Sequence, residues 1–186
     1  MRGTVGGSDR PGYVRRFDGP VAIELRGFVR PEVKADLVRL TGTLSDLTGL
    51  EFYVGDKRLS SHGGIVIEVT SYADMQSRYG QGGPLCFCRN WGNGGTLHSA
   101  RIEISDEYAD CLAHELMHAI GFDNHWTGPD ATDARPSALA RRYAPARTSD
   151  FSAWDRKAIE MLYDERLKPG TPRQSALSLA ETILAE

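Results

Sequence analysis

The chain has 186 residues, which is the length of one ordinary domain. Its 40% hydrophobic and 25% charged residues are typical of a soluble globular protein and exclude disorder over most of its length. The 22 Lys and Arg residues against 25 Asp and Glu give a formal charge of -3, which argues against a nucleic-acid partner. No apolar run approaches the roughly 20 residues of a membrane-spanning helix, so we expect no transmembrane segment.

The N-terminal stretch differs in composition from the rest of the chain. Residues 1–12 are Gly-rich and polar, and Pro11 and Gly12 close the stretch, so we predict a flexible leader over 1–12. The remainder, residues 13–186, is then a single domain. Met1 to Asp9 lack the charged start and apolar middle of a secretory signal. A cytosolic protein and a mature exported form both fit this start.

The first half of the domain alternates short β-type runs with one helix. Apolar residues recur every three or four positions from Pro31 to Leu47 and predict an amphipathic helix, with Pro31 in its first turn. Gly-rich segments predict a loop over 76–84 and a turn over 92–95. Strand-like composition bounded by turn residues predicts strands over 21–25, 51–54, 65–69, 85–89 and 97–104.

The second half changes to helical patterns. Residues 107–120 predict a helix that Gly121 ends, and a long loop follows over 128–149. A helix over 150–162, capped by Ser149 or Asp150, comes next, and a last helix covers 172–184. The order of elements predicts an α+β domain with a mixed sheet of about five strands.

A histidine-rich motif carries the chemistry. The residues from His114 to His125 read His-Glu-Leu-Met-His-Ala-Ile-Gly-Phe-Asp-Asn-His. His114 and His118 are four residues apart, so on a helix they share one face and their imidazoles can bind one ion. After Gly121 the backbone can turn sharply and bring His125 back as a third ligand. Three protein ligands with an open fourth position are typical of a catalytic Zn2+ site.

Glu115 is the candidate catalytic residue. It lies one step round the helix from His114, off the metal, where it can act as general base on water that the zinc ion makes acidic. The same proton can then pass to a leaving amine. We therefore expect hydrolysis of a peptide bond, and the competing interpretation is an amphipathic helix that carries surface histidines by chance.

The stretch from His114 to His125 resembles the active-site helix of the metzincin clan of zinc peptidases. A second segment, Phe151-Ser-Ala-Trp-Asp155 to Ile159-Glu-Met-Leu-Tyr163, resembles the closing helix of matrix-metalloproteinase-like domains. The chain is most similar to an uncharacterised bacterial family of exported metzincin-like proteins. The resemblance implies a zincin-like fold with an active-site helix, C-terminal helices, and an antiparallel edge strand near Leu85 to Arg89 that lines the cleft.

Two features depart from the metzincin pattern. The usual third ligand comes three residues after the Gly, where this chain has Asn124, so the loop must bulge by one residue to present His125. Asp123 is a competing oxygen ligand, less favoured than His125. The clan also has a Met-containing turn beneath the metal, and no Met lies between His118 and Met161. Ser137 to Leu139 occupies about the same place, with Leu139 as an apolar floor.

The three cysteines, Cys86, Cys88 and Cys111, allow at most one internal disulfide. From composition alone, a bridge from Cys86 or Cys88 to Cys111 and three reduced buried thiols both remain open. The resemblance favours the bridge, because its exported members often carry a cysteine just before the motif, and it implies a secreted or periplasmic protein.

Other chemistry-bearing residues give weaker signals. His98 lies in a predicted strand, where an ordinary position is favoured over a substrate contact, and Tyr143 has packing as its default over oxyanion stabilisation. The basic pair Arg15-Arg16 predicts a solvated surface. We therefore expect a monomeric zinc endopeptidase that acts on a peptide or protein substrate. The alternatives are a zinc-stabilised binding module without turnover and a metal-free structural domain.

Overall fold

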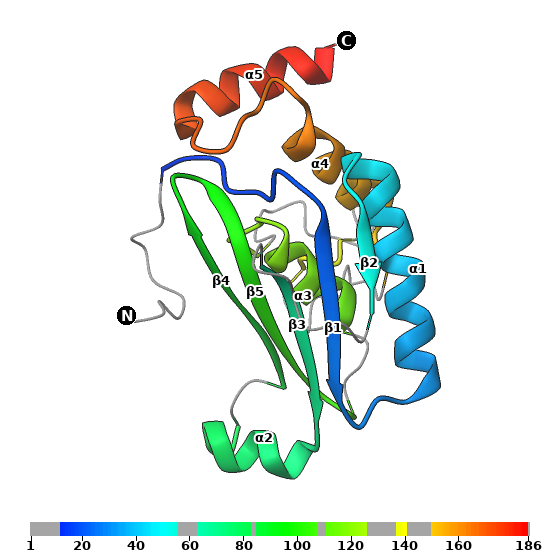
Figure 1. The fold of residues 1–186 in the computed structure, drawn as a ribbon. Helices are drawn as coiled ribbons and strands as arrows, with labels where there is room; N and C mark the ends of the chain where they lie inside the picture. Colours follow the sequence, from blue (N-terminus) through cyan, green and yellow to red (C-terminus); the bar gives the residue numbers. More distant parts are fainter. Residues whose placement is uncertain are drawn as a thin grey trace.

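A computed structural model describes residues 12–55, 63–82, 85–107, 111–125, 137–140 and 150–185. The predicted leader over 1–12 therefore lies almost wholly outside the described residues, and so does most of the predicted loop over 128–149. The described part is an α+β structure in which helices pack on a mixed five-stranded sheet, as the sequence predicts (Figure 1). Among the described helices, none is long and apolar enough to cross a membrane.

The sheet has the strand order β2-β1-β3-β5-β4. Strands β2, β1, β3 and β5 run parallel to one another, whereas the edge strand β4 is antiparallel to β5. The tight turn between β4 and β5 is built on Gly94 and Gly95, which both have positive φ. The strand bounds are β1 Val21–Gly27, β2 Phe52–Val54, β3 Gly64–Thr70, β4 Cys86–Asn93 and β5 Thr96–Ser105.

The two faces of the sheet differ sharply in chemistry. In the pairing register Ile65 lies beside Ala100 and Ile67 beside Ile102, and this face packs into the hydrophobic core under the helices. The opposite face carries charged side chains, because strand residues alternate between faces. There Glu68 forms ion pairs with Arg78 and Arg101. Helix α3, which carries the histidine motif, therefore packs against the apolar face of the sheet.

Two long helices frame the core. Helix α1 (Pro31–Thr48) begins with Pro31 and ends at Gly49, which has a φ of 70° that favours glycine, and it buries Leu37, Leu40 and Leu44. Helix α4 (Ala153–Tyr163) packs beside it, as Figure 1 shows, and buries Ile159. The remaining helices are α2 (Tyr72–Tyr79), α3 (Leu112–Ala119) and α5 (Arg173–Ala185).

Several predicted boundaries differ from those of the structure. The predicted loop over 76–84 begins too early, because Ser71 caps α2 by accepting from the Asp74 amide, and this helix continues to Tyr79. Helix α4 is capped by Ser152, two to three residues later than predicted, because Ser152 and Asp155 form a reciprocal capping box.

The helix predicted to begin at residue 107 also begins later, because residue 107 lies in a turn and α3 starts at Leu112. The strand Cys86–Asn93 extends into the turn predicted over 92–95. Helix ends and hairpin ends are decided by single capping contacts and cross-strand pairs, which periodicity does not register.

Candidate metal centre

Helix α3 carries the histidine motif on the core side of the sheet. Its eight residues are almost all buried, and Leu116 and Met117 pack into the hydrophobic core. Gly121, one residue after the helix cap, has a φ of 129°, a conformation that other residues rarely adopt. A Cβ at this position would lie 2.0 Å from the Arg15 carbonyl oxygen. The predicted sharp turn after the helix is therefore present, and only glycine fits it.

The turn brings three imidazoles together. The Nε2 atom of His114 lies 3.2 Å from Nε2 of His118 and 3.1 Å from Nε2 of His125. Ligand atoms of all three residues lie within 4.8 Å of one another. His114 is buried, His118 is half-buried and His125 is exposed. The group is thus open on the His125 side and closed toward the core, and all three predicted ligands belong to it.

Backbone carbonyls determine which nitrogen of each helical histidine carries the proton. His114 Nδ1 lies 2.6 Å from the Ala138 carbonyl oxygen, and His118 Nδ1 lies 2.5 Å from the Phe122 carbonyl oxygen. A carbonyl only accepts hydrogen bonds, so Nδ1 is the donor and Nε2 of each neutral ring holds a lone pair. Two such Nε2 atoms therefore face each other at 3.2 Å. A shared cation turns this repulsive contact into an attractive one.

The spacing fits a zinc ion. Four nitrogens around zinc at about 2.0–2.1 Å in a tetrahedron lie about 3.3–3.4 Å apart. The two measured Nε2 separations, 3.1 and 3.2 Å, are close to this value. Histidine ligands that donate Nδ1–H to a carbonyl are the usual arrangement at zinc. His114, His118 and His125 would hold the metal, and the geometry leaves the fourth position for water or substrate.

Glu115 follows His114 on the helix and is also buried, with 3% of its surface exposed. The negative charge of Glu115 acts on the thiol of Cys88 in the edge strand β4. Burial raises the pKa of the Cys88 thiol well above its usual value, and the carboxylates of Glu115 and Asp123 raise it further. Cys88 therefore remains a neutral thiol, and it donates a hydrogen bond to Asn90. Glu115 is thus buried close enough to Cys88 of β4 for its charge to act on that thiol.

Residues 137–140 form a buried shelf beneath His114. Ala138 provides the carbonyl that accepts from His114, and Leu139 packs in the hydrophobic core. The shelf is held by Asp155 of α4, whose carboxylate accepts from the Ser137 hydroxyl at 2.6 Å and from the Ala138 amide at 2.8 Å. This segment was expected near the metal. Its anchor, Asp155, was identified only as part of a resemblance, and the contact spans 17 residues, beyond the reach of periodicity.

The edge strand β4 is tied to α3 at both ends of the helix. A disulfide joins Cys86 to Cys111, which directly precedes the helix. At the other end the Asn90 side-chain amide donates to the His118 carbonyl at 2.7 Å. The expected bridge is present, and Cys86 rather than Cys88 is the partner of Cys111. Asn90 was not predicted, because nothing in its sequence context marks it.

Asp123, the competing ligand, lies in the loop before His125 and is engaged elsewhere. The Asp123 carboxylate accepts from Arg15 Nη1 at 3.3 Å and does not belong to the group of possible metal ligands. The prediction of a solvated surface for Arg15-Arg16 is wrong. Arg16 is buried, donates to the Leu162 and Asp164 carbonyls, and lies over the Tyr163 ring. The sequence does not indicate these contacts, because their partners lie more than 100 residues further along the chain.

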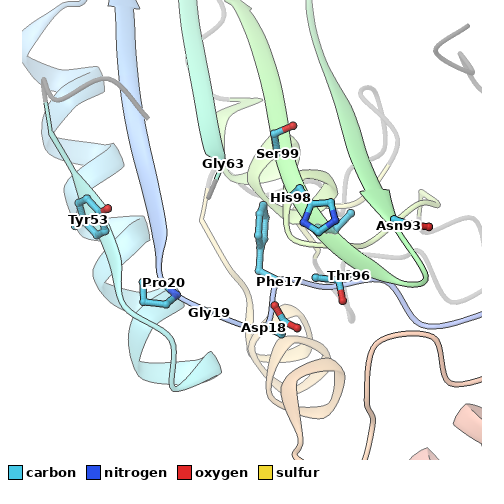
Figure 2. Close-up of a pocket in the computed structure, with 11 residues that line it drawn as sticks. Phe17, Asp18, Gly19, Pro20, Tyr53, Gly63, Asn93, Thr96, His98 and Ser99 are labelled. Atoms are coloured by element: carbon cyan, nitrogen blue, oxygen red, sulfur yellow. The ribbon is translucent and has the colours of Figure 1, made fainter. Parts of the chain in front are cut away.

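Of the two weaker candidates, His98 lies outside the centre and Tyr143 is not among the described residues. His98 is exposed and lines an open hollow of about 1020 Å³ together with Phe17, Asp18 and Tyr53, as Figure 2 shows. None of the three clustered histidines lines this hollow. A register irregularity in the β4–β5 pairing lies beside His98. Tyr143 lies outside the described residues.

Comparison with known proteins places the chain in a family. No curated protein matches the sequence. A family model described as "Protein of unknown function (DUF2927)" matches residues 5–181, which covers the leader's end, the whole sheet, the histidine motif and most of α5. The chain therefore belongs to the DUF2927 family.

Proposed function

We propose that this protein is a zinc-dependent metallopeptidase of the metzincin type. The observation that carries the proposal is the convergence of three Nε2 atoms, with His114 and His118 each held by a backbone carbonyl in the tautomer that ligates metal. Such an open three-histidine site is the form that catalytic zinc takes. The proposal covers zinc as the metal, peptide hydrolysis as the reaction, and Glu115 as the catalytic residue.

Features of the fold around the site support the metzincin assignment. The edge strand β4 is antiparallel and lies against α3, as expected for a strand that lines a substrate cleft. The glycine turn redirects the chain toward His125, and the shelf at 137–140 takes the place expected for the clan's Met-containing turn. Asp155 of helix α4 holds this shelf by accepting from the Ser137 hydroxyl and the Ala138 amide.

A zinc ion in this site would supply Lewis acidity, which polarises a peptide carbonyl and makes water acidic enough to yield hydroxide near neutral pH. The chain's own residues do the rest. Glu115 accepts the proton of the attacking water and delivers it to the departing amine. His114 and His118 stay oriented because Ala138 and Phe122 hold their Nδ1 protons. His125 is exposed, so a peptide substrate would approach the ligands from that side.

The disulfide supports an oxidising compartment for this activity. A bridge between Cys86 and Cys111 persists in secreted and periplasmic proteins and is rare in the cytosol. We propose that the protein acts outside the cytoplasm. Its expected substrate is then a peptide or protein in the same compartment.

The test is cleavage of a mixture of unrelated denatured proteins by the zinc-loaded protein, with products identified by mass spectrometry. Glu115→Gln keeps the shape of the side chain and removes the base, so we expect it to retain zinc and lose at least about a hundredfold in rate. Glu160→Gln, an exposed carboxylate on α4, is the matched control and should cleave like the wild type.

Two outcomes contradict the proposal. Retention of cleavage by Glu115→Gln would refute the assigned mechanism. Stoichiometric zinc with no cleavage of any protein in the mixture would favour the zinc-stabilised binding module instead.

A further inference from the structure

We propose that Arg15 is a positioning residue for His125, so that the segment before β1 controls the affinity of the metal centre. This inference rests on the proposed metal centre. It concerns the only ligand of the three that lies outside α3.

The backbone of residues 13–17 is anchored by two separate parts of the chain. Val14 exchanges backbone hydrogen bonds with the α4–α5 connection, donating to Thr171 and accepting from Gly170. Arg16 does the same with the β4–β5 hairpin, donating to Gly95 and accepting from Leu97. Figure 1 shows this dark blue segment crossing between the hairpin and that connection. The backbone on both sides of Arg15 is therefore held in place.

The same segment is pressed against the end of α3. The Arg15 carbonyl lies so close to Gly121 that a Cβ there would be 2.0 Å from the carbonyl oxygen. Tyr163 links the two parts as well, because its hydroxyl accepts from the Phe17 amide and donates to the Ile120 carbonyl. Burial raises the pKa of the Tyr163 phenol, so the donor proton is retained. Arg15 thus projects from a fixed base beside the ligand loop.

The side chain of Arg15 then reaches the loop itself. Its guanidinium donates to Asp123, two residues before His125, and both side chains are largely shielded, with 19% and 26% exposed. Earlier in the loop, Phe122 is held through its amide, which donates to the Met117 carbonyl, and through its carbonyl, which accepts from His118. The ion pair lies two residues before His125, which is itself exposed. Loss of the pair would loosen the loop, so metal binding would have to restore more of its order, and that cost lowers affinity.

The experiment titrates metal-free protein with Co2+, whose visible absorption reports the number and geometry of its ligands. Arg15→Gln removes the charge and the fork of donors, and we expect about tenfold weaker Co2+ binding, within the 10- to 100-fold range typical of residues that support ligands. Arg15→Lys keeps the charge and should recover most of the affinity. Arg26→Gln breaks an ion pair with Glu24 on the other face of the sheet and should bind like the wild type.

A double-mutant cycle separates positioning from general destabilisation. In a His125→Ala background the ligand that Arg15 positions is gone, so Arg15→Gln should cause no further loss of affinity. A purely structural role would weaken binding equally in both backgrounds. If Arg15→Gln does not fold, Asp123→Ala removes the same pair from the loop side and should give the same pattern.

Co2+ binding by the wild type tests the metal centre, whereas the effect of Arg15→Gln tests the role of Arg15. Wild-type protein that binds no Co2+ would refute the metal centre itself. Wild-type protein that binds one Co2+ through His125, together with Arg15→Gln of unchanged affinity and spectrum, would overturn only the role of Arg15. An equal loss in the His125→Ala background would overturn it too.

Discussion

His114 donates from Nδ1 to the backbone carbonyl of Ala138, 24 residues further along the chain, at 2.6 Å. This bond links α3 to the shelf at 137–140, and Asp155 in turn links the shelf to α4. The orientation of a metal-binding imidazole therefore depends on a carboxylate that does not touch it. Supporting contacts of this kind are typical of metal sites.

Asp155→Ala should destabilise the fold and weaken metal binding together. The substitution removes the acceptor for Ser137, Ala138 and the Ser152 cap, and we expect a loss of about 2–4 kcal/mol in the free energy of unfolding. Metal affinity should fall about tenfold because the Ala138 carbonyl is no longer held. Denaturant unfolding and metal titration measure the two effects.

Asp164→Asn is the matched control for this prediction. Asp164 follows the last residue of the same helix, its side chain is half-buried, and its carboxylate pairs with Arg166. We expect little change in either quantity. Wild-type metal affinity in folded Asp155→Ala would contradict the role of the shelf.

Breaking the disulfide should destabilise the protein without changing the metal ligands. The bridge closes a loop with a sequence separation of 25, and Cys86→Ser should lower the free energy of unfolding by about 3.5 kcal/mol on the loop-entropy estimate. Cys88→Ser leaves the bridge intact and should cost much less. Mass spectrometry of the unreduced, denatured protein should show one free thiol. Three free thiols would refute the bridge and remove the main support for an oxidising compartment.

Replacing Gly121 tests the turn that delivers His125. Gly121→Ala forces a Cβ into a positive-φ position against the Arg15 carbonyl, so we expect a loss of at least about 1 kcal/mol in stability and weaker metal binding. Gly42→Ala, in open space on α1, should instead stabilise the protein by up to about 1 kcal/mol. Thermal unfolding compares the two variants. Equal stability of both would show that the turn is not strained by a side chain.

Removing the metal should lower the melting temperature of the wild type. A ligand that binds only the folded state adds stability, and a chelator takes that stability away. The same chelator should have no effect on His118→Ala, which lacks a central ligand. A wild-type melting temperature that does not respond to chelator would support a metal-free structural domain.

Local patterns predicted the histidine cluster, whereas distant contacts set the details around it. The spacing of His114 and His118, followed by Gly121, is sufficient to predict the shared helix face and the turn, because both depend on a few adjacent residues. The choice between Cys86 and Cys88 was not predictable. The two residues are two positions apart on one strand, so they share the face that meets α3.

Arg15 shows why sequence could not supply the supporting residues. A pair of arginines near the start of a domain is usually solvated, and its pattern carries no periodic signal. Its partner Asp123 lies 108 residues away. Such a contact exists only because the sheet, the hairpin and the α4–α5 connection place the segment beside the ligand loop. Short helix α2 was missed for the opposite reason, because a local cap at Ser71 outweighed the Gly-rich composition that follows.

The most direct test of the metal centre is the zinc content of protein purified without chelator and without metal-affinity resin. We predict about one zinc per chain, lost in His118→Ala and in His125→Ala and retained in His98→Ala, which changes an exposed histidine outside the cluster. Correctly folded wild-type protein that contains no zinc and takes up none on addition would contradict the account.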